Sequence, residues 1–307
     1  MYKRWLETYQ NQAGQFNKNI HIIIITNGLF IGIIALVNSI LQNCNRNEKK
    51  NLNFHFLVDI DETVELDNLI NIVQAFEGDE FNYDIKEFSN NDYKKLIQDN
   101  IIMENDNIIK YLDFAKFFIS SIYSNLDKII YLNSNMICQG DISELRDEYF
   151  NLLDDDNQLL SSENINNGDI KDSTFNSYNI SSENLKYFNA GIFITSLDNW
   201  RQNNIQDTLL YWMKENKKHS LFKFGAQPIL NIAFINKVKY IDDKWNTVRI
   251  GNNSNLSIDE IESAKILHWN GDAKWWNMDG LYKNYGEIYN LIKSALTYPT
   301  TTTTTTT

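Results

Sequence analysis

The sequence predicts an α/β fold in which a mostly parallel central sheet is flanked by helices. In the first half of the chain, strand-like segments alternate with segments of helical apolar spacing, which is the pattern of βαβ units. Most of the strand-like segments are apolar, and the first is a β-branched run. The chain has 307 residues, of which 43% are hydrophobic. That is enough for one large domain with its own core.

The first predicted element is a strand at residues 22–25, where four consecutive isoleucines favour extended backbone. Thr26 and Asn27 follow it with residue types that are common in turns. From Phe30 onward the apolar spacing is helical. Residues 20–41 together have nearly the length of a membrane span, so a membrane-anchored enzyme is an alternative interpretation. The turn residues inside the stretch favour a strand, a loop and a helix, and we expect no transmembrane segment.

The next elements alternate in the same way. The predicted order is a strand at 53–58, a helix at 66–76, a weaker strand at 81–88, a long helix at 108–124 and a buried strand at 128–132. Ligands of such sheets bind beyond the carboxyl ends of the strands. We therefore expect functional residues directly after the first strand and directly after Leu132.

The second half begins less regularly. Residues 151–184 are acidic, rich in Asn and Ser and poorly periodic, which indicates a long surface insertion or lid. Helical spacing returns at 209–217 and 226–234. The expected organisation is an N-terminal extension at 1–19, one domain at 20–297 that contains the insertion, and a disordered Thr-rich tail at 298–307.

Charge and cysteine content exclude several classes of protein. The formal net charge of -12 argues against a nucleic-acid-binding protein and against a polybasic membrane anchor. Cys44 and Cys138 are the two cysteines, too few for a disulfide framework or a zinc site. They suit a reducing compartment, and we expect a cytoplasmic protein. The sequence does not indicate an oligomeric state.

Four sequence blocks occur in a fixed order from about residue 20 to about residue 277. They are IHIIIITNGLF, FAKFF with LDKIIYLNSN, YFNAGIFITSLDNWR, and ILHWNGDAKWWN, with GAQPILNIAF before the last. Together they resemble glycosyltransferase family 8, the retaining UDP-sugar transferases. The resemblance implies a GT-A-type single domain with a Rossmann-like nucleotide-binding half.

The resemblance also implies roles for individual residues. His268 stands where the family has a metal-ligating histidine, and Gln227 where it has the glutamine beside the reacting sugar carbon. Gln227 and Asn189 are the expected catalytic residues. The residues expected to bind the donor are Thr26, Asn27, Lys116, Asn133, Asn135, Ala190, Gly191, Gly271 and Lys274.

The chain departs from the family pattern at acidic positions. In family members an Asp-x-Asp motif holds Mn²⁺ or Mg²⁺, which together with a lysine stabilises the departing diphosphate. Asn133-Ser134-Asn135 stands at that position here, and amides bring no negative charge to a cation. Ala226 replaces an aspartate that the family associates with sugar binding. We expect at most a weak Mn²⁺ or Mg²⁺ site, formed by Asn133, Asn135 and His268.

Two hypotheses follow. In the first, the chain transfers a hexose from a UDP-sugar to a hydroxyl group of a glycan or protein with retention of anomeric configuration. Lys116, Lys274 and His268 then stabilise the departing diphosphate. In the second, it is a catalytically impaired pseudo-glycosyltransferase that binds a glycan, a nucleotide or a partner protein. Aspartates restored at positions 133 and 135 distinguish the two, because a gain of activity would indicate an intact scaffold.

Overall fold

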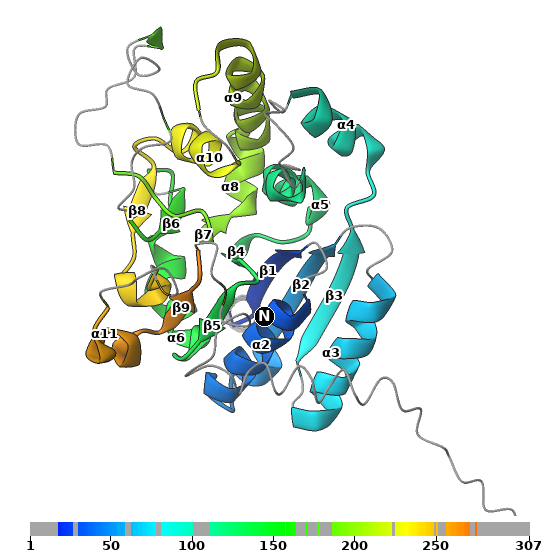
Figure 1. The fold of residues 1–307 in the computed structure, drawn as a ribbon, viewed down its shortest axis with the longest axis vertical. Helices are drawn as coiled ribbons and strands as arrows, with labels where there is room; N and C mark the ends of the chain where they lie inside the picture. Colours follow the sequence, from blue (N-terminus) through cyan, green and yellow to red (C-terminus); the bar gives the residue numbers. More distant parts are fainter. Residues whose placement is uncertain are drawn as a thin grey trace, which may run out of the picture.

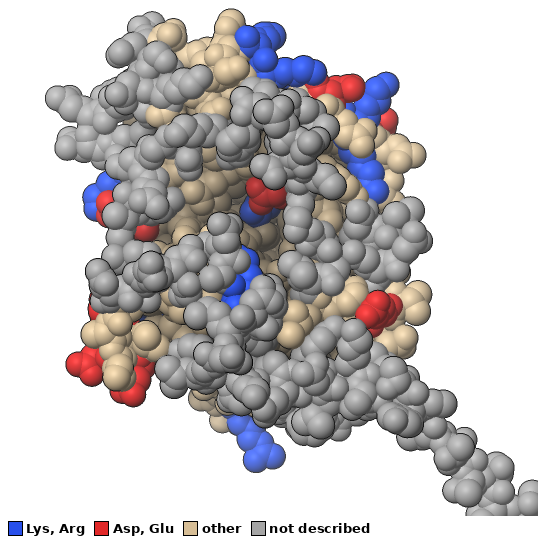
Figure 2. All heavy atoms as spheres, in the orientation of Figure 1, with Lys and Arg blue, Asp and Glu red and all other residues tan. Residues whose placement is uncertain are grey.

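The computed structural model describes residues 18–26, 30–58, 63–77, 81–100, 111–156, 158–163, 170, 177–178, 186–222, 225–248, 250, 256–270 and 274 (Figure 1). The predicted N-terminal extension lies almost wholly outside these residues, and the predicted tail lies entirely outside them. The space-filling view in the same orientation shows a face that is hollowed near its centre, with basic and acidic side chains inside the hollow (Figure 2).

A seven-stranded sheet forms the centre of the molecule, in the order β3-β2-β1-β4-β7-β6-β8 (Figure 1). Strands β3, β2, β1 and β4 are mutually parallel, whereas β7 runs antiparallel to both β4 and β6. The predicted mostly parallel sheet is therefore confirmed. The bounds are β1 Ile20–Thr26, β2 Leu52–Val58, β3 Asn82–Glu87, β4 Lys128–Leu132, β6 Leu159–Ser161, β7 Ile192–Ser196 and β8 Val238–Tyr240.

The isoleucine run of β1 separates the two sides of the core. Side chains alternate across a strand, and Ile22 and Ile24 pack in one cluster with helix α2 (Phe30–Asn43). Ile23 and Ile25 pack in the other, with the segment Tyr111–Phe118. Residues 20–41 are thus a buried strand and the greater part of a packed helix. In the parts of the chain that the structure describes, no helix is long and apolar enough to cross a bilayer.

Helices cover both faces of the sheet, and three of them agree with the helices predicted at 66–76, 209–217 and 226–234. The α-helices after α2 are α3 Thr63–Glu77, α4 Asn91–Asn100, α5 Ile119–Ile122, α6 Ile142–Tyr149, α8 Leu197–Gln202, α9 Ile205–His219, α10 Gln227–Ala233 and α11 Ile258–Ser263. Short 3₁₀ helices are η1 Lys49–Asn51, η2 Tyr111–Phe118, η3 Phe150–Leu152 and η4 Asp243–Asn246.

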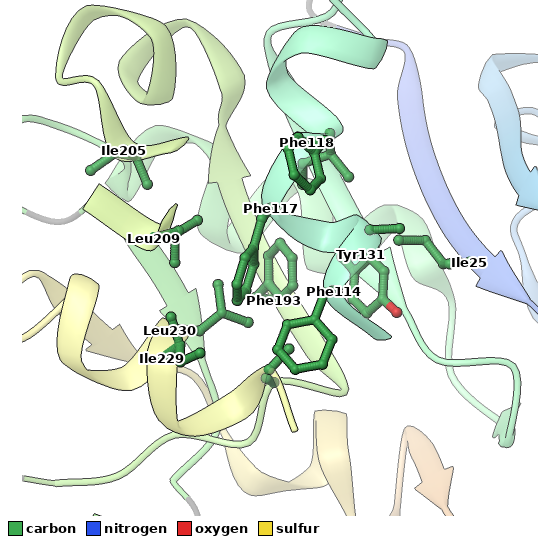
Figure 3. Close-up of a cluster of buried hydrophobic side chains, with 14 of the residues drawn as sticks. Ile25, Phe114, Phe117, Phe118, Tyr131, Phe193, Ile205, Leu209, Ile229 and Leu230 are labelled. Atoms are coloured by element: carbon green, nitrogen blue, oxygen red, sulfur yellow. The ribbon is translucent and has the colours of Figure 1, made fainter. Parts of the chain in front are cut away.

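The long helix predicted at 108–124 is wrong in type. Its described part is the 3₁₀ helix η2 followed by the single turn α5. Side chains three residues apart eclipse one another in a 3₁₀ helix, and Lys116 pairs there with Asp113 at 2.7 Å. Phe114 and Phe117 point into the same apolar cluster as residues of β7 and α10 (Figure 3). The ion pair and the buried rings both favour the tighter helix.

The range interpreted as an insertion, 151–184, contains part of the central sheet. Strand β6 lies inside it, is fully buried and pairs with both β7 and β8. Most of the remainder, from 164 to 184, lies outside the described residues apart from three positions.

A second, two-stranded sheet pairs β5 (Met136–Cys138) antiparallel with β9 (Ile266–His268). Met136 lies opposite His268, and the backbone N–H of Trp269 donates to the carbonyl of Asn135 at 3.1 Å. This pairing brings two segments that are 134 residues apart to the same place beside the end of β4.

Candidate functional site

Three segments converge beyond the carboxyl end of β4. Asn133 directly follows β4, and its backbone N–H donates to the carbonyl of Gly191 at 2.8 Å. The β5–β9 pairing adds His268 from the other side. Ligands of such folds bind beyond the carboxyl ends of the parallel strands. The structure therefore places the predicted residues of these segments at the expected end of the sheet.

Gly191 lies at the point where these segments meet. A Cβ atom at this position would lie 2.3 Å from Cε1 of His268, 2.9 Å from Nδ2 of Asn133 and 2.9 Å from Oδ1 of Asn189. Such distances are shorter than carbon atoms tolerate, so only glycine fits without displacement of these side chains. Three predicted site residues therefore pack around a fourth, Gly191.

His268 is buried and neutral. Its Nδ1 lies 2.9 Å from Oδ1 of Asn246, which accepts, so Nδ1 carries the proton and Nε2 a lone pair. Among the described residues, Nε2 has no hydrogen-bond partner. Burial, followed by the charges of Lys274 and Lys116, lowers the pKa of His268 to about 3. The site thus contains an imidazole that can accept a hydrogen bond or ligate an ion.

The two asparagines at the Asp-x-Asp position make structural hydrogen bonds. Asn133 Oδ1 accepts from the hydroxyl of Tyr131 at 2.9 Å. Asn135 Nδ2 donates to the carbonyl of Trp269 at 2.7 Å, and Lys274 Nζ donates to the same carbonyl at 2.7 Å. An aspartate could replace Asn133 as an acceptor, but at 135 it would place a carboxylate oxygen against a carbonyl oxygen.

Lys116 is buried beside the site and lies 5.2 Å from the centre of the Tyr131 ring. Burial opposes its charge, but the adjacent Asp113 carboxylate outweighs burial and raises the pKa of Lys116 above its ordinary value. Partial burial opposes the charge of Asp113, whose side chain is 42% exposed, but Lys116 and the backbone N–H of Ala226 lower the pKa of that carboxyl. Both groups are therefore charged at neutral pH.

Sequence analysis missed Asp113. The available signal was its position three residues before Lys116, together with the 3₁₀ helix that aligns such a pair. Because acidic and basic residues three positions apart also pair on ordinary α-helices, this spacing alone did not mark the pair as part of a site.

Gln227 and Asn189 hold the loop that carries Ala190 and Gly191. Gln227 Oε1 accepts from the backbone N–H of Ala190 at 3.0 Å. Asn189 Oδ1 accepts from the backbone N–H of Gly191 at 2.9 Å. Phe188, which precedes Asn189, is held by Asn231. The side-chain amide of Asn231 accepts from the backbone N–H of Phe188 and donates to the carbonyl of Phe188. The loop is thus positioned by side-chain amides.

The remaining predicted residues are only partly described. Thr26 is buried at the end of β1, and its hydroxyl has no partner among the described residues. Asn27 and Gly271 lie outside the described residues.

The side chains expected to ligate a metal ion do not fit Mn²⁺ or Mg²⁺. These cations prefer carboxylate oxygens, whereas the three expected ligands are one neutral imidazole and two neutral amides. The positive charges of Lys274 and Lys116 lower the pKa of His268, and the nearby carboxylate of Asp113 is already paired with Lys116. Within the described ranges, no group of three or more His, Cys, Asp or Glu side chains is placed to hold a metal ion.

Comparison with known families gives a match over most of the chain. The model described as glycosyl transferase family 8 matches residues 13–280. Glycosyltransferase 8 domain-containing protein 1 of Danio rerio is 28% identical over 205 residues, which is 59% of this chain and 55% of that protein. Probable galacturonosyltransferase 14 of Arabidopsis thaliana is 28% identical over 189 residues, 55% of this chain and 33% of that protein. The chain thus spans about a third to about half of the length of these curated relatives.

Solved structures share the fold. The galactosyltransferase LgtC in complex with donor and acceptor sugar analogs is 17% identical with a TM-score of 0.64, covering 90% of this chain and 96% of that one. The apo structure of the bifunctional glycosyltransferase WbbM is 19% identical with a TM-score of 0.65, covering 88% of this chain and 49% of that one. At this identity the likeness establishes the GT-A-type fold.

Proposed function

Because this chain belongs to glycosyltransferase family 8, we propose that it transfers a hexose from a UDP-sugar to a hydroxyl group of a glycan or protein acceptor with retention of anomeric configuration. One observation carries the proposal. Asn133, Asn189, Gly191 and His268, from three segments far apart in sequence, meet at the carboxyl end of β4. Each stands where the family pattern has a donor-site residue.

The loop of residues 189–191 forms the sugar side of the proposed site. Its backbone is fixed by Gln227 and by the side chain of Asn189. A loop that is already held in place can position a reacting group without having to rearrange during the reaction. Gln227 lies beside this loop, and in the proposal Gln227 and Asn189 orient the hexose for transfer.

The cationic side of the proposed site is formed by Lys116 and Lys274. Transfer breaks the bond between the sugar and the diphosphate, and the leaving diphosphate gains negative charge. Both lysines are near enough to His268 for their charges to lower its pKa. They can therefore stabilise the leaving group electrostatically. His268 Nε2 offers an uncharged acceptor to a donor hydroxyl.

We also propose that the donor binds without a divalent cation. The support is the chemistry of the side chains at the site. Neutral amides occupy the Asp-x-Asp position, and positive charge comes from Lys116 and Lys274. Lysine ammonium groups bind phosphates as point charges. They take over the charge neutralisation that a metal ion supplies in members of the family with the acidic motif.

Release of UDP from UDP-glucose and UDP-galactose, measured with EDTA and separately with Mn²⁺, tests this function. We expect hydrolysis or transfer in EDTA, changed less than about threefold by Mn²⁺, since the lysines supply the charge. Binding of UDP-sugars without any release, for every common donor and both conditions, would contradict transfer and favour the pseudo-glycosyltransferase hypothesis. Dependence on Mn²⁺ would contradict the metal-independent site.

A further inference from the structure

Asp113 is an accessible carboxylate held against buried groups. The side chain of its partner Lys116 is 6% exposed, whereas the side chain of Asp113 is 42% exposed. Oδ1 accepts from Lys116 at 2.7 Å, and Oδ2 accepts from the backbone N–H of Ala226 at 3.1 Å. A carboxylate has about four lone-pair positions. Two are used, and the exposed side of the group leaves others for a ligand.

The position of the carboxylate relative to the loop is well defined. Gly225 has a φ angle of +88°, which favours glycine, and a Cβ there would lie 3.4 Å from Oδ2 of Asp113. The two residues after Gly225 are Ala226, which donates to Asp113, and Gln227, which accepts from Ala190. One short segment therefore connects the carboxylate to the sugar side of the proposed site.

Residue 226 is an alanine and brings no acidic side chain to this segment, whereas the carboxylate of Asp113 accepts from its backbone N–H. We propose that Asp113 accepts hydrogen bonds from hydroxyl groups of the donor sugar and selects a neutral hexose over a hexuronic acid. This inference rests on the proposed function, because it concerns the sugar side of the same donor site.

The proposed selectivity follows from charge. The side chain of Asp113 is 42% exposed and that of Lys116 only 6%, so a hexuronic carboxylate on this side of the site meets the Asp113 carboxylate before the lysine. Asp113 itself repels such a carboxylate, and repulsion between like charges is strong where little water separates them. Sugar hydroxyls, in contrast, donate to a carboxylate in charge-assisted hydrogen bonds. One group thus attracts the neutral donor and rejects the acidic one.

The test is a calorimetric competition on the full chain with UDP, UDP-glucose, UDP-galactose, UDP-glucuronic acid and UDP-galacturonic acid. The wild-type protein should prefer at least one neutral donor over its uronic counterpart by about tenfold or more. Asp113→Asn keeps an oxygen that can accept from Ala226 but removes the charge. It should weaken binding of the neutral donor about tenfold relative to binding of UDP, and it should reduce the preference for neutral over uronic donors.

A matched control removes a comparable ion pair elsewhere. Asp198 pairs with Arg201 at the same spacing on α8, and Asp198→Asn should match the wild type for every donor. Asp113→Glu, which keeps the charge, should retain the neutral preference. A purely structural role of Asp113 would lower the melting temperature of D113N without a change in the ratio of donor affinities.

The outcomes separate the inference from the function on which it rests. UDP binding with no preference between neutral and uronic donors in the wild type overturns the inference and leaves the donor site intact. The same conclusion follows if D113N binds all donors with wild-type ratios. Absence of UDP binding in the wild type overturns both. If D113N does not fold, the wild-type ratio and D113E decide the question.

Discussion

Gly191 lies so close to the ring of His268 that a Cβ atom at position 191 would stand 2.3 Å from Cε1 of that histidine. Residue 191 precedes β7 of the central sheet, and residue 268 ends β9 of the small sheet. The contact therefore joins the two sheets at the candidate site. It also connects the loop at 189–191 with the buried imidazole.

Gly191→Ala should disrupt this junction. The added methyl group must displace His268 or Asn133, and such overpacking costs about 1–3 kcal/mol of unfolding free energy. We expect a lower melting temperature. Displacement of His268 or Asn133 from the site should also reduce the affinity for UDP by about tenfold or more. Gly140→Ala is the matched control, because its Cβ would lie 2.9 Å from Cβ of Lys265, away from the site. The G140A protein should lose stability but bind UDP normally. An equal loss of UDP binding in both variants would contradict the proposal that the residues around Gly191 form the UDP site.

The two asparagines should respond differently to aspartate. Asn133→Asp can still accept from Tyr131, so its melting temperature should stay near the wild-type value while Mn²⁺ affinity rises about tenfold, because ligand charge increases hard-cation affinity. Asn135→Asp loses the bond to Trp269 and should cost about 1–3 kcal/mol. Thermal unfolding and Mn²⁺ titration by electron paramagnetic resonance measure both effects. A stable N135D protein, or an N133D protein with unchanged Mn²⁺ affinity, would refute this assignment.

Lys274→Ala should weaken UDP binding. Removal of one ammonium group that neutralises phosphate charge should raise the Kd of UDP about tenfold, the effect of one charge-assisted hydrogen bond. Lys274→Arg should restore most of the affinity. Lys265→Ala is the control, since Lys265 pairs with Glu144 and packs over Trp245 instead. Calorimetry at two salt concentrations measures the effect, and equal UDP affinity in K274A and wild type would remove Lys274 from the site.

Stability should fall in mild acid, and His21 should account for part of the loss. Its Nδ1 lies 2.9 Å from Nε2 of His55, and burial, then the charge of His55, lowers the pKa of His21 to about 4. The unfolded chain, with a pKa near 6.5, binds the proton more readily. The stabilisation is complete above about pH 6.5 and decreases by about 1.4 kcal/mol per pH unit as pH falls toward about 4.

His21→Asn should flatten this dependence, and His219→Gln, at an exposed histidine on α9, should not. Chemical denaturation between pH 7.5 and 4.5 provides the comparison. Parallel stability curves for H21N and the wild type would show that His21 does not cause the loss.

The sequence was sufficient for the elements built on strong local patterns. The isoleucine run of β1 and the apolar spacing of α2 are visible because each has one simple period, and the predicted 128–132 strand coincides with β4. The site positions at 133, 189, 191 and 268 came from family resemblance. Their convergence is a tertiary feature that depends on the β5–β9 pairing.

Other features could not be predicted from one sequence. A 3₁₀ and an α-helix place apolar residues at similar spacing, so η2 and the pair Asp113–Lys116 were missed. Asn246 is one asparagine in an Asn-rich chain, and its contact with His268 spans 22 residues without a local signal. Strand β6 is only three residues long and lies in a polar region, where periodicity cannot reveal it.

The central claim is a UDP-sugar site that works through lysines instead of a metal ion. Calorimetric titration of the full chain with UDP, in EDTA and in Mn²⁺, tests it most directly. We predict binding in EDTA with an affinity that Mn²⁺ changes less than about threefold, since the positive charge belongs to the protein. Binding that appears only with Mn²⁺ would contradict the lysine-based site, and no binding in either condition would contradict a donor site altogether.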